Sequence, residues 1–458
     1  MRPDFEPLDR ALEAAAARGA TDAEAYMERV AGLSVRTANA VVEKFSLADS
    51  RGMGLRVYAG DSLGRAYTSD LSADGVEAAV AAAVESARVT PGEPERALPE
   101  PDLYPAFAEG SYASEDLEIL GDLESEPAGR KIEFAMEMER LAREGDPRIA
   151  AVEVSAYSES TGEVILANTR GFRSAYRASA CYGYVVAIAE REGESQTGFG
   201  FTAGHSFPDL DAASAADEAS SMAVSLLGGR PVGTGRFPVL IDNLPAAEVL
   251  AVLGAALSAE AVVKGKSFLA GRVGEEVAAP AVTVTDDGLM RGGYGTAPFD
   301  GEGVGAASRK LIEEGTLVTF LHNTYTARRM GASTTGNAAR GSYRSPVGVA
   351  PTNIFLTPGS LTPDELVSAM GTGFRVMELQ GVHVGLNPVT GEVSLGARGL
   401  WVENGRPLHA VREVTIAGTI DGMLRGIVGI ADDLRFTPLL GGIGTPSILV
   451  EGLTVSGA

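Results

Sequence analysis

From Gly233 onward the chain consists mostly of short runs in which apolar and polar residues alternate, separated by turns that contain glycine. The runs are AVTVTDD, TNIFLTPG, FRVMELQGVHVG, GEVSLGARGLWVENG, VREVTIAGTI and SILVEGLTVSG. Alternation places every second side chain on the same face of a strand. This half is therefore predicted to form a curved or barrel-like antiparallel sheet. A short strand at FPVLIDN and one continuous helix over residues 245–263 precede it.

Residues 1–90 are predicted to form an α+β unit. Helical spacing over residues 7–18 is followed by the strand-like runs AEAYMERV and LSVRTANAVVEKFSLAD, and then by GLRVYAGDSLGRAYTSD, which is typical of a hairpin. Ser72 is the expected cap of the helix ADGVEAAVAAAVESA, because a serine oxygen can accept a hydrogen bond from the first turn.

Residues 91–118 are predicted to be a linker, since five prolines fall within its first fifteen residues. Residues 119–232 then repeat the earlier order: a helix at GRKIEFAMEMERLARE, strands at AAVEVSAYSES, GEVILANTRG, FRSAYRASACYGYVVAIAERE and SQTGFGFTAG, and a helix at DAASAADEASSMAVSLL. The recurrence is either a degenerate duplication or a chance similarity of two α+β units. The predicted class is α+β: an N-terminal α/β region with mixed sheets and flanking helices, then a β-rich domain at 233–458.

Charge and composition exclude several classes of function. The 61 acidic residues outnumber the 38 basic ones, and a net charge of −23 would repel a nucleic-acid backbone. The apolar runs are too short to span a bilayer, and the opening MRPDFEPLDR is charged, so we expect a cytoplasmic protein with no membrane contact. The single cysteine, Cys181, lies in the apolar run SACYGYVVAIA and is interpreted as a packed side chain rather than a nucleophile.

No catalytic motif is visible in the local sequence. Each of the four histidines stands alone, without metal-ligand spacing to another: His205, His322, His383 and His409. The carboxylates in DDGLM and FDGEGV, which include Asp286, Asp287 and Asp300, could bind a cation or act in a metal-independent hydrolase. Asp-Gly is also common turn chemistry, and we favour the turn.

Several longer segments together resemble the TldD/TldE (PmbA) family of cytoplasmic metallopeptidase subunits. These are TYTARRMG followed by STTGNAAR, GLRVYAGDSLGRAYTSDLS, SFLAGRVGEEVAAPAVTVTDDG, APFDGEGV and GEVSLGARGLWVENGRPLHAVREVTIAG. The likeness covers nearly the whole chain, and the combination is more specific than any single segment.

The resemblance also implies what this chain lacks. TldD-type subunits carry a metal-binding His-Glu-x-x-x-His helix completed by a cysteine near the C-terminus. The matching positions here are Leu250, Ala251 and Ala255 within LAVLGA, and the C-terminal segment reads FTPLLGGIGTPS, without cysteine. Hydrocarbon side chains offer no lone pair to a metal and no carboxylate to activate water. The sequence therefore resembles the metal-free TldE/PmbA type, with a vestigial metal-site helix that is free to stay regular.

A function is implied by the same resemblance. The chain would be the non-catalytic subunit of a heteromeric peptidase that degrades unfolded or small peptides or trims precursors. Zinc or a similar divalent metal would sit in a TldD-type partner, and this chain would hold no cofactor. The alternative is a peptide-binding or regulatory homodimer without proteolytic activity. An acidic cleft would favour basic over acidic peptides.

The polar stretch over residues 323–340 supplies the candidate substrate-binding residues. In such a family an extended peptide would bind through its backbone. Threonine and asparagine side chains could bond that backbone, and arginines could bind carboxylates. The candidates are Arg328, Arg329, Thr334, Thr335, Asn337 and Arg340. Two alternatives remain: the segment pairs with the protein's own carboxylates and builds turns, which we favour, or it lies at a subunit interface.

Overall fold

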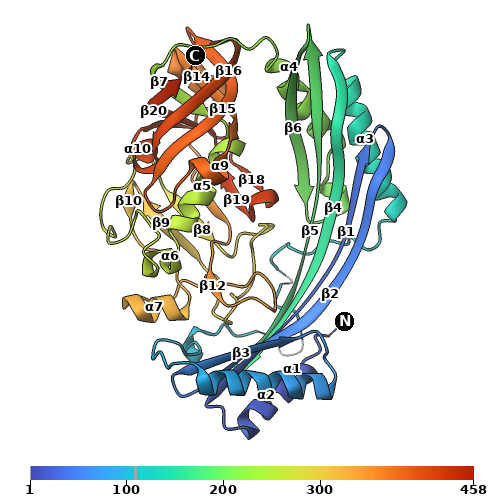
Figure 1. Ribbon diagram of the computed structural model, residues 1–458, viewed down its shortest axis with the longest axis vertical. Helices are drawn as coiled ribbons and strands as arrows, with labels where there is room; N and C mark the ends of the chain where they lie inside the picture. The colour runs from blue at the N-terminus through green and yellow to red at the C-terminus, as the bar shows by residue number, and fades with distance from the viewer. Residues whose placement is uncertain (1, 108–110, 115, 458) are drawn as a thin grey trace.

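A single six-stranded sheet occupies the N-terminal half of the computed structural model, which describes residues 2–107, 111–114 and 116–457. Its strand order is β3–β2–β1–β4–β5–β6. Figure 1 shows the long strands curving along one side of the molecule, with the C-terminal half on the other. The strands are β1 (Asp22–Ala38), β2 (Val41–Ala59), β3 (Ser62–Thr68), β4 (Ile149–Asn168), β5 (Arg173–Arg191) and β6 (Glu194–Gly204).

The N-terminal sheet differs from expectation in two details. Every pairing in it is antiparallel, so the predicted mixed sheet is wrong in this half. The strands predicted at 150–160 and 162–171 are one strand, β4, because Gly162 stays in register with Val30 on one side and Ala178 on the other. The α+β class itself is confirmed.

Two pairs of helices pack on this sheet. The first pair is α1 (Glu6–Ala17) and α2 (Ala73–Val89), and the second is α3 (Ala128–Glu144) and α4 (Ala212–Ser225). Ser72 caps α2 as predicted, since its side chain accepts a hydrogen bond from Gly75 N at 3.2 Å. The two predicted units thus share one sheet, joined where β1 pairs with β4. The duplication and the unit boundaries stay predictions.

The described residues of the segment 91–118 lie between the halves, form no regular strand and include one short helical turn, η1 (Pro101–Leu103). Residues 108–110 and 115 of the predicted linker lie outside the described residues. Leu98 is fully buried, so this part of the connector is packed against the protein.

The predicted barrel is confirmed in the C-terminal half. Five strands close on one another in the order β16–β15–β14–β7–β20, with β16 pairing back to β20. They are β7 (Gly235–Ile241), β14 (Gly373–Gln380), β15 (Glu392–Glu403), β16 (Arg406–Thr419) and β20 (Ile448–Ser456), and β17 (Ile427–Ile430) adds to the edge of β20. Only the pairing of β7 with β14 is parallel within this sheet.

Another sheet of the C-terminal half, with six shorter strands, lies beside the barrel in the order β10–β9–β8–β13–β19–β18. Its strands are β8 (Val284–Asp287), β9 (Ser308–Glu313), β10 (Thr316–Leu317), β13 (Ile354–Leu356), β18 (Arg435–Thr437) and β19 (Ile443–Thr445). The pair β11 (Ala338–Ala339) and β12 (Gly348–Val349) forms a separate ladder. The remaining helices are α5 (Asn243–Ala256), α6 (Ala259–Val263), α7 (Thr324–Met330), α8 (Pro363–Met370), α9 (Val382–Gly385) and α10 (Ile420–Arg425), with short turns η2 (Phe207–Asp209) and η3 (Pro438–Leu440).

The helix predicted over residues 245–263 is interrupted, so the expectation of one regular helix is wrong. Helix α5 ends at Ala256, and α6 begins at Ala259. At the break, Leu321 donates its backbone N–H to Leu257 O and accepts one from Ala259 N, both at 2.9 Å. Hydrogen bonds to a distant segment therefore replace two that the helix would have made.

No helix among residues 2–107, 111–114 and 116–457 is both long and apolar enough to cross a membrane.

Candidate functional site

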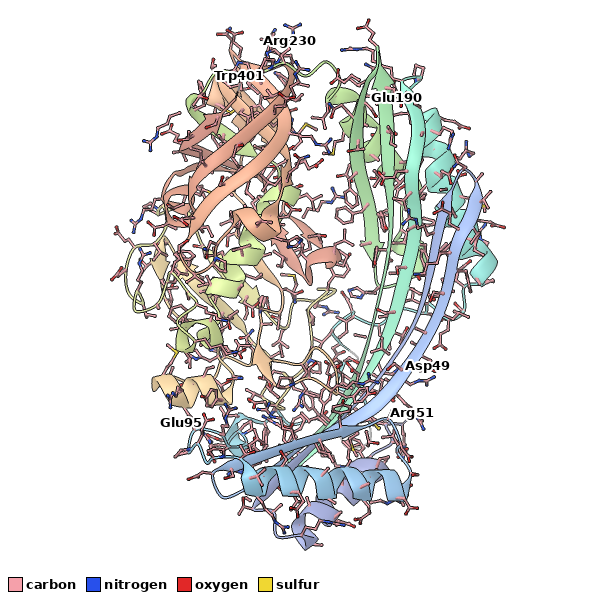
Figure 2. All side chains as sticks on the ribbon, in the orientation of Figure 1. Asp49, Arg51, Glu95, Glu190, Arg230 and Trp401 are labelled. Carbon is pink, nitrogen blue, oxygen red and sulfur yellow. The ribbon has the colours of Figure 1, made fainter. Side chains whose placement is uncertain are left out.

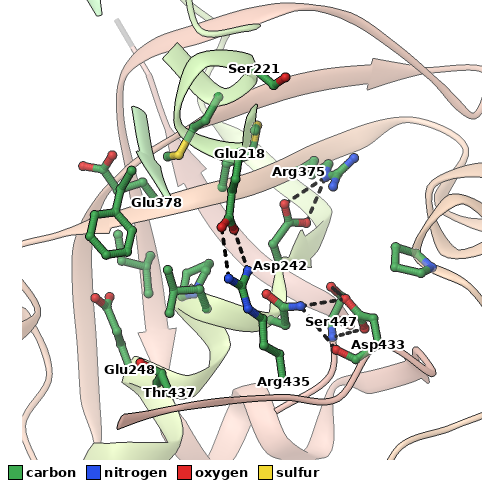
Figure 3. Close-up of a pocket in the computed structure, with 18 of the residues that line it drawn as sticks. Glu218, Ser221, Asp242, Glu248, Arg375, Glu378, Asp433, Arg435, Thr437 and Ser447 are labelled. Carbon is green, nitrogen blue, oxygen red and sulfur yellow. Dashed lines mark hydrogen bonds and ion pairs between the residues drawn. The ribbon is translucent and has the colours of Figure 1, made fainter. Parts of the chain in front are cut away.

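A cleft of about 770 Å³ lies between the two halves of the molecule. One wall comes from β6 and α4 of the N-terminal half. The other comes from the start of α5, from the barrel strands β14 and β15, and from β18 and η3. A concave site with apolar walls and a few converging polar groups is the usual form of a ligand site. Figure 3 shows these groups and their hydrogen bonds.

An ion pair stands where the barrel meets α5. Asp242 follows the last residue of β7 and precedes α5, and Arg375 extends from the neighbouring strand β14. Arg375 Nε donates to the two carboxylate oxygens of Asp242 at 2.9 and 3.1 Å. Burial raises the pKa of Asp242 although Arg375 opposes the shift. The pair is thus a fixed, largely desolvated part of the wall.

A second ion pair joins the two halves across the cleft. Arg435 on β18 donates to both oxygens of Glu218 on α4, at 2.5 and 3.0 Å. The same guanidinium donates to Phe201 O at 3.0 Å and stacks on the Phe201 ring at 4.0 Å. A bidentate carboxylate contact fixes both distance and orientation. Arg435 therefore helps to hold β18 against α4 and the end of β6.

Asp433 is satisfied by neutral donors. It accepts hydrogen bonds from Ser447 N and Ser447 Oγ, both at 2.7 Å, and from Asn243 Nδ2 at 3.1 Å. These contacts connect the loop before β18 to the start of α5 and to the segment before β20. Three elements of the wall are therefore joined at one carboxylate.

Glu248 on α5 differs from these carboxylates because one of its oxygens, Oε2, is buried and has no hydrogen-bond partner among the described residues. Burial raises the pKa of Glu248 to about 7, and the nearby Glu378 carboxylate adds to the shift. Thr437, the last residue of β18, is 1% exposed, and its Oγ1 also lacks a partner in the part of the chain that the structure describes. Both residues line the cleft.

The positions that match the family's metal ligands do not form a metal site. Leu250 is buried in the hydrophobic core and lines a small apolar cavity with residues such as Met423 and Ile448. Ala251 and Ala255 lie farther along the same helix. A divalent metal needs N, O or S donors, and these three side chains supply none, so the residues do not fit the metal. Within residues 2–107, 111–114 and 116–457, no group of three or more His, Cys, Asp or Glu could hold a metal ion.

The structure nevertheless brings together the two segments that the family resemblance relates to metal binding. Helix α5 packs against β18, η3 and β19, which contain the FTPLLGGIGT sequence where a cysteine would complete the site. Segments almost two hundred residues apart thus meet beside the cleft.

The arginines of the polar stretch make contacts within the chain and do not line the cleft. Arg328 donates to Glu100 at 2.7 Å and to Leu98 O at 3.1 Å. Arg329 pairs with Glu95 at 3.4 Å, and Figure 2 shows Glu95 on the connector just below α7. These bonds attach α7 to the segment between the halves.

The threonines and the asparagine of the polar stretch are also held internally. Thr334 Oγ1 and Thr335 Oγ1 donate to His322 O at 3.2 and 3.1 Å. Asn337 Nδ2 donates to Asp286 Oδ2 at 2.7 Å and to Ala350 O at 3.2 Å. Such contacts agree with the alternative in which the polar stretch bonds to the protein's own groups and builds turns. Substrate binding by these residues stays a prediction.

A buried charge network joins the last residue of this stretch to the N-terminal sheet. Arg340 and Arg56 both pair with Glu24, and Arg56 also pairs with Glu302 at 2.7 Å. Burial alone would raise the pKa of Glu302, but the Arg56 charge and hydrogen bond lower it. Burial and the Glu302 charge raise the pKa of the neighbouring Asp300. The network fastens β1 and β2 to the C-terminal half.

The other residues singled out in the sequence have structural contacts. Asp300 accepts hydrogen bonds from Glu302 N and Val304 N at 2.8 and 3.0 Å, and Asp287 accepts one from Leu289 N at 3.0 Å, as turn-forming carboxylates do. Cys181 is buried with Sγ 3.3 Å from Ser206 O, and burial raises the pKa of its thiol to about 12. It is a packed cysteine, as predicted.

The four histidines do not form a common site. His205 has Nδ1 2.5 Å from Ser179 O and Nε2 3.0 Å from Gly292 O, so it bridges β5 to a loop of the C-terminal half. His322 is buried just before α7, and burial lowers its pKa. His383 lies in α9, and His409 on β16 approaches Ala410 O at 2.9 Å.

Sequence reasoning missed the residues that line the cleft. Four separate parts of the chain supply them: Glu218, then Asp242 with Glu248, then Arg375, and last Asp433 with Arg435. No local spacing relates them. The one usable signal was Asp242 between a strand and a helix, where a carboxylate is also a common cap.

Comparison with known proteins identifies the family. Residues 23–87, 121–227 and 234–457 match the first, central and C-terminal domains of the PmbA/TldA metallopeptidases. The chain is 30% identical to the metalloprotease PmbA homolog of Haemophilus influenzae over 453 residues, which is 98% of this chain and 94% of that protein. It is 28% identical to metalloprotease PmbA of Escherichia coli O157:H7, over 94% of this chain and 91% of that protein.

Solved structures show the same fold. A Thermotoga maritima protein described as a proposed modulator of a DNA gyrase superposes with a TM-score of 0.89 at 29% identity, covering 98% of this chain and 99% of that one. TldE from Thermococcus kodakarensis superposes with a TM-score of 0.87 at 21% identity, covering 98% of this chain and 100% of that one. The chain belongs to the PmbA/TldD metallopeptidase family.

Proposed function

We propose that this chain is the non-catalytic, TldE/PmbA-type subunit of a heteromeric metallopeptidase. The observation that carries the proposal is the chemistry of α5, where Leu250, Ala251 and Ala255 replace the donors of the family's metal-binding helix. A TldD-type partner would supply zinc or a similar divalent ion. When bound there, the metal would activate water for hydrolysis of the peptide bond.

The contribution of this chain would be to bind and position peptide. The cleft beside α5 has apolar walls for side chains and charged groups that are already held in place. Preorganised groups lose little entropy when a ligand binds. The ligands we propose are unfolded or small peptides, which would be degraded or trimmed by the assembled enzyme in the cytoplasm.

Peptidase activity after reconstitution tests this proposal. The chain alone, the TldD-type partner alone and a 1:1 mixture would be incubated with an unfolded peptide and zinc, and cleavage would be followed by mass spectrometry. We expect cleavage by the mixture and none by this chain. A partner variant without its metal ligands is the control and should abolish activity in the mixture.

Two results would overturn the proposal. Cleavage by this chain alone would mean that its own residues form a catalytic site. Failure of the chain to bind or activate any TldD-type partner, together with peptide binding by a homodimer, would favour the regulatory alternative.

A further inference from the structure

Two polar groups in the cleft lack partners, although the charged groups around them are paired. Glu248 Oε2 and Thr437 Oγ1 are buried and make no hydrogen bond with any residue that the structure describes. In Figure 3 neither residue carries a dashed line, whereas Glu218, Asp242 and Asp433 do. A buried polar atom without a partner is destabilising, so each of these atoms would be stabilised by a ligand that forms a hydrogen bond with it.

The two unpartnered groups come from elements in contact. Glu248 is on α5 and Thr437 ends β18, and α5 packs against β18 and η3. The hydroxyl can accept a hydrogen bond, and the carboxylate can accept one and also provide charge. A ligand group that fits both residues therefore donates hydrogen bonds and carries a positive charge.

The charge of the lining points to the same kind of ligand. Five carboxylates line the cleft, against two guanidinium groups, and both guanidinium groups are already paired with carboxylates. A cation entering the cleft meets an excess of negative charge, whereas an anion would have to displace an existing pair. The carboxylates are Glu218, Asp242, Glu248, Glu378 and Asp433.

The apolar lining favours a cation on an aliphatic stem. Leucine and methionine side chains occupy both walls: Met222, Met377, Leu379, Leu400, Leu439 and Leu440. A hydrocarbon chain would be buried against them while its charged end reached the carboxylate. An ammonium group has three donors on one atom and suits a separate carboxylate and hydroxyl.

We propose that Glu248 and Thr437 form a subsite for a primary alkylammonium group carried by a peptide, either a lysine side chain or a free amino terminus. The proposal rests on the proposed function only in taking a peptide as the carrier. The subsite belongs to this chain and needs neither partner nor metal.

The protonation of Glu248 gives the subsite a pH dependence. Burial raises the pKa of Glu248, and the Glu378 carboxylate on β14 adds to the shift. Glu378 itself pairs with Arg398 on β15. Two further ion pairs line the same cleft, Asp242–Arg375 and Glu218–Arg435. A bound ammonium favours the ionised carboxylate, so binding near pH 6 releases a proton. Affinity for a lysine side chain therefore rises between pH 6 and pH 7.5.

Binding of three fluorescent peptides to the isolated chain tests the subsite. The first is acetylated and contains one lysine, the second has norleucine in its place and a free amino terminus, and the third is acetylated with norleucine. We expect at least one of the first two to bind about tenfold more tightly than the third, equivalent to about 1.4 kcal/mol. Tight binding of the first peptide would identify the lysine side chain as the ammonium that binds, and tight binding of the second would identify the free amino terminus.

Substitutions then assign the binding to these residues. Glu248→Gln should reduce binding of the charged peptide to the level of the neutral one, and Thr437→Val should weaken it by about threefold to tenfold. Glu403→Gln, which changes an exposed carboxylate at the end of β15, is the matched control and should bind as the wild type does. Thermal unfolding of each variant shows whether it is folded.

Equal binding of all three peptides by the wild-type chain would overturn the proposal, as would unchanged binding by a folded Glu248→Gln variant. Either failure leaves the reconstitution of peptidase activity untouched. A failed reconstitution, in turn, does not alter binding by the isolated chain.

Discussion

Arg56 lies at the centre of a buried charge network whose members come from distant parts of the chain. It pairs with Glu24 through two nitrogens and with Glu302 through a third, and it is 6% exposed. Two carboxylates buried without a cation would be costly, because their hydration is lost and their charges repel. The stability of the network therefore depends on the positive charge of the Arg56 side chain.

Removal of Arg56 is expected to destabilise the protein strongly. Arg56→Ala should lower the free energy of unfolding by about 3 kcal/mol or more, since it leaves Glu302 without its cation. Urea unfolding measures the change. Arg51→Ala, on the same strand and exposed (Figure 2), should change stability by less than about 0.5 kcal/mol. Similar effects of the two substitutions would contradict the assigned role.

The raised pKa of Glu248 predicts how the free energy of unfolding changes with pH. Burial raises its pKa from 4.5 to about 7. The folded state therefore holds the proton more tightly, and the stability contributed by this group is present below pH 4.5 and is lost as pH rises to about 7. Gln cannot ionise, so Glu248→Gln should be more stable than the wild type at pH 8 by about 1–2 kcal/mol.

Urea unfolding of both proteins at pH 5 and pH 8 measures this effect. At pH 5 the folded wild type has a neutral Glu248, and the difference between the two proteins should be small. A difference of the same size at both pH values would show that Glu248 ionises normally in the folded protein.

At the scale of elements, strands in the two parts of the N-terminal sheet approach alanine-rich helices at glycine. A Cβ on Gly64 of β3 would lie 1.9 Å from Ala83 O of α2, and one on Gly198 of β6 would lie 2.2 Å from Ala219 O of α4. Real Cβ atoms do not come so close to backbone, so both strand-helix contacts depend on glycine. The same kind of contact occurs in each part of the sheet, and the duplication stays a prediction.

Gly198→Ala should therefore force β6 and α4 apart. We expect a loss of about 2–3 kcal/mol in the free energy of unfolding, the cost of overpacking a close contact. Chemical denaturation measures it. Gly129→Ala in α3 is the control, because nothing lies within 4 Å of that Cβ and alanine favours a helix. A Gly198→Ala variant as stable as the wild type would contradict this prediction, because it would show that β6 and α4 can adjust to the added Cβ.

The secondary structure that could be predicted was the part determined by residues close together in the sequence. Ser72 and the turn after Ala59 act through neighbouring residues, and both were found. The break between α5 and α6 was not found, because it depends on Leu321, about sixty residues away. The predicted break between two strands at Thr161 is wrong, because Thr161 pairs with Ala31 and Ser179, and this pairing with two neighbouring strands is invisible in the sequence.

At the scale of the whole molecule, the family was recognised from sequence because its characteristic segments are continuous. The cleft was not, because α4, α5, β14 and β18 meet only after folding. The polar stretch that drew attention in the sequence pairs with Glu95, Glu100 and Glu24, residues that no local pattern relates to it. Its conspicuous composition reflects contact with several distant carboxylates.

The metal content of the purified chain decides whether it is a metal-free subunit. The chain, and its 1:1 complex with a TldD-type partner, would be dialysed against zinc, freed of excess metal and measured by elemental analysis. We expect only trace zinc in the chain alone and about one ion per complex, because α5 offers no donors at Leu250, Ala251 and Ala255. About one zinc ion per chain in the isolated protein, together with peptide cleavage, would show instead that the chain holds a catalytic metal of its own.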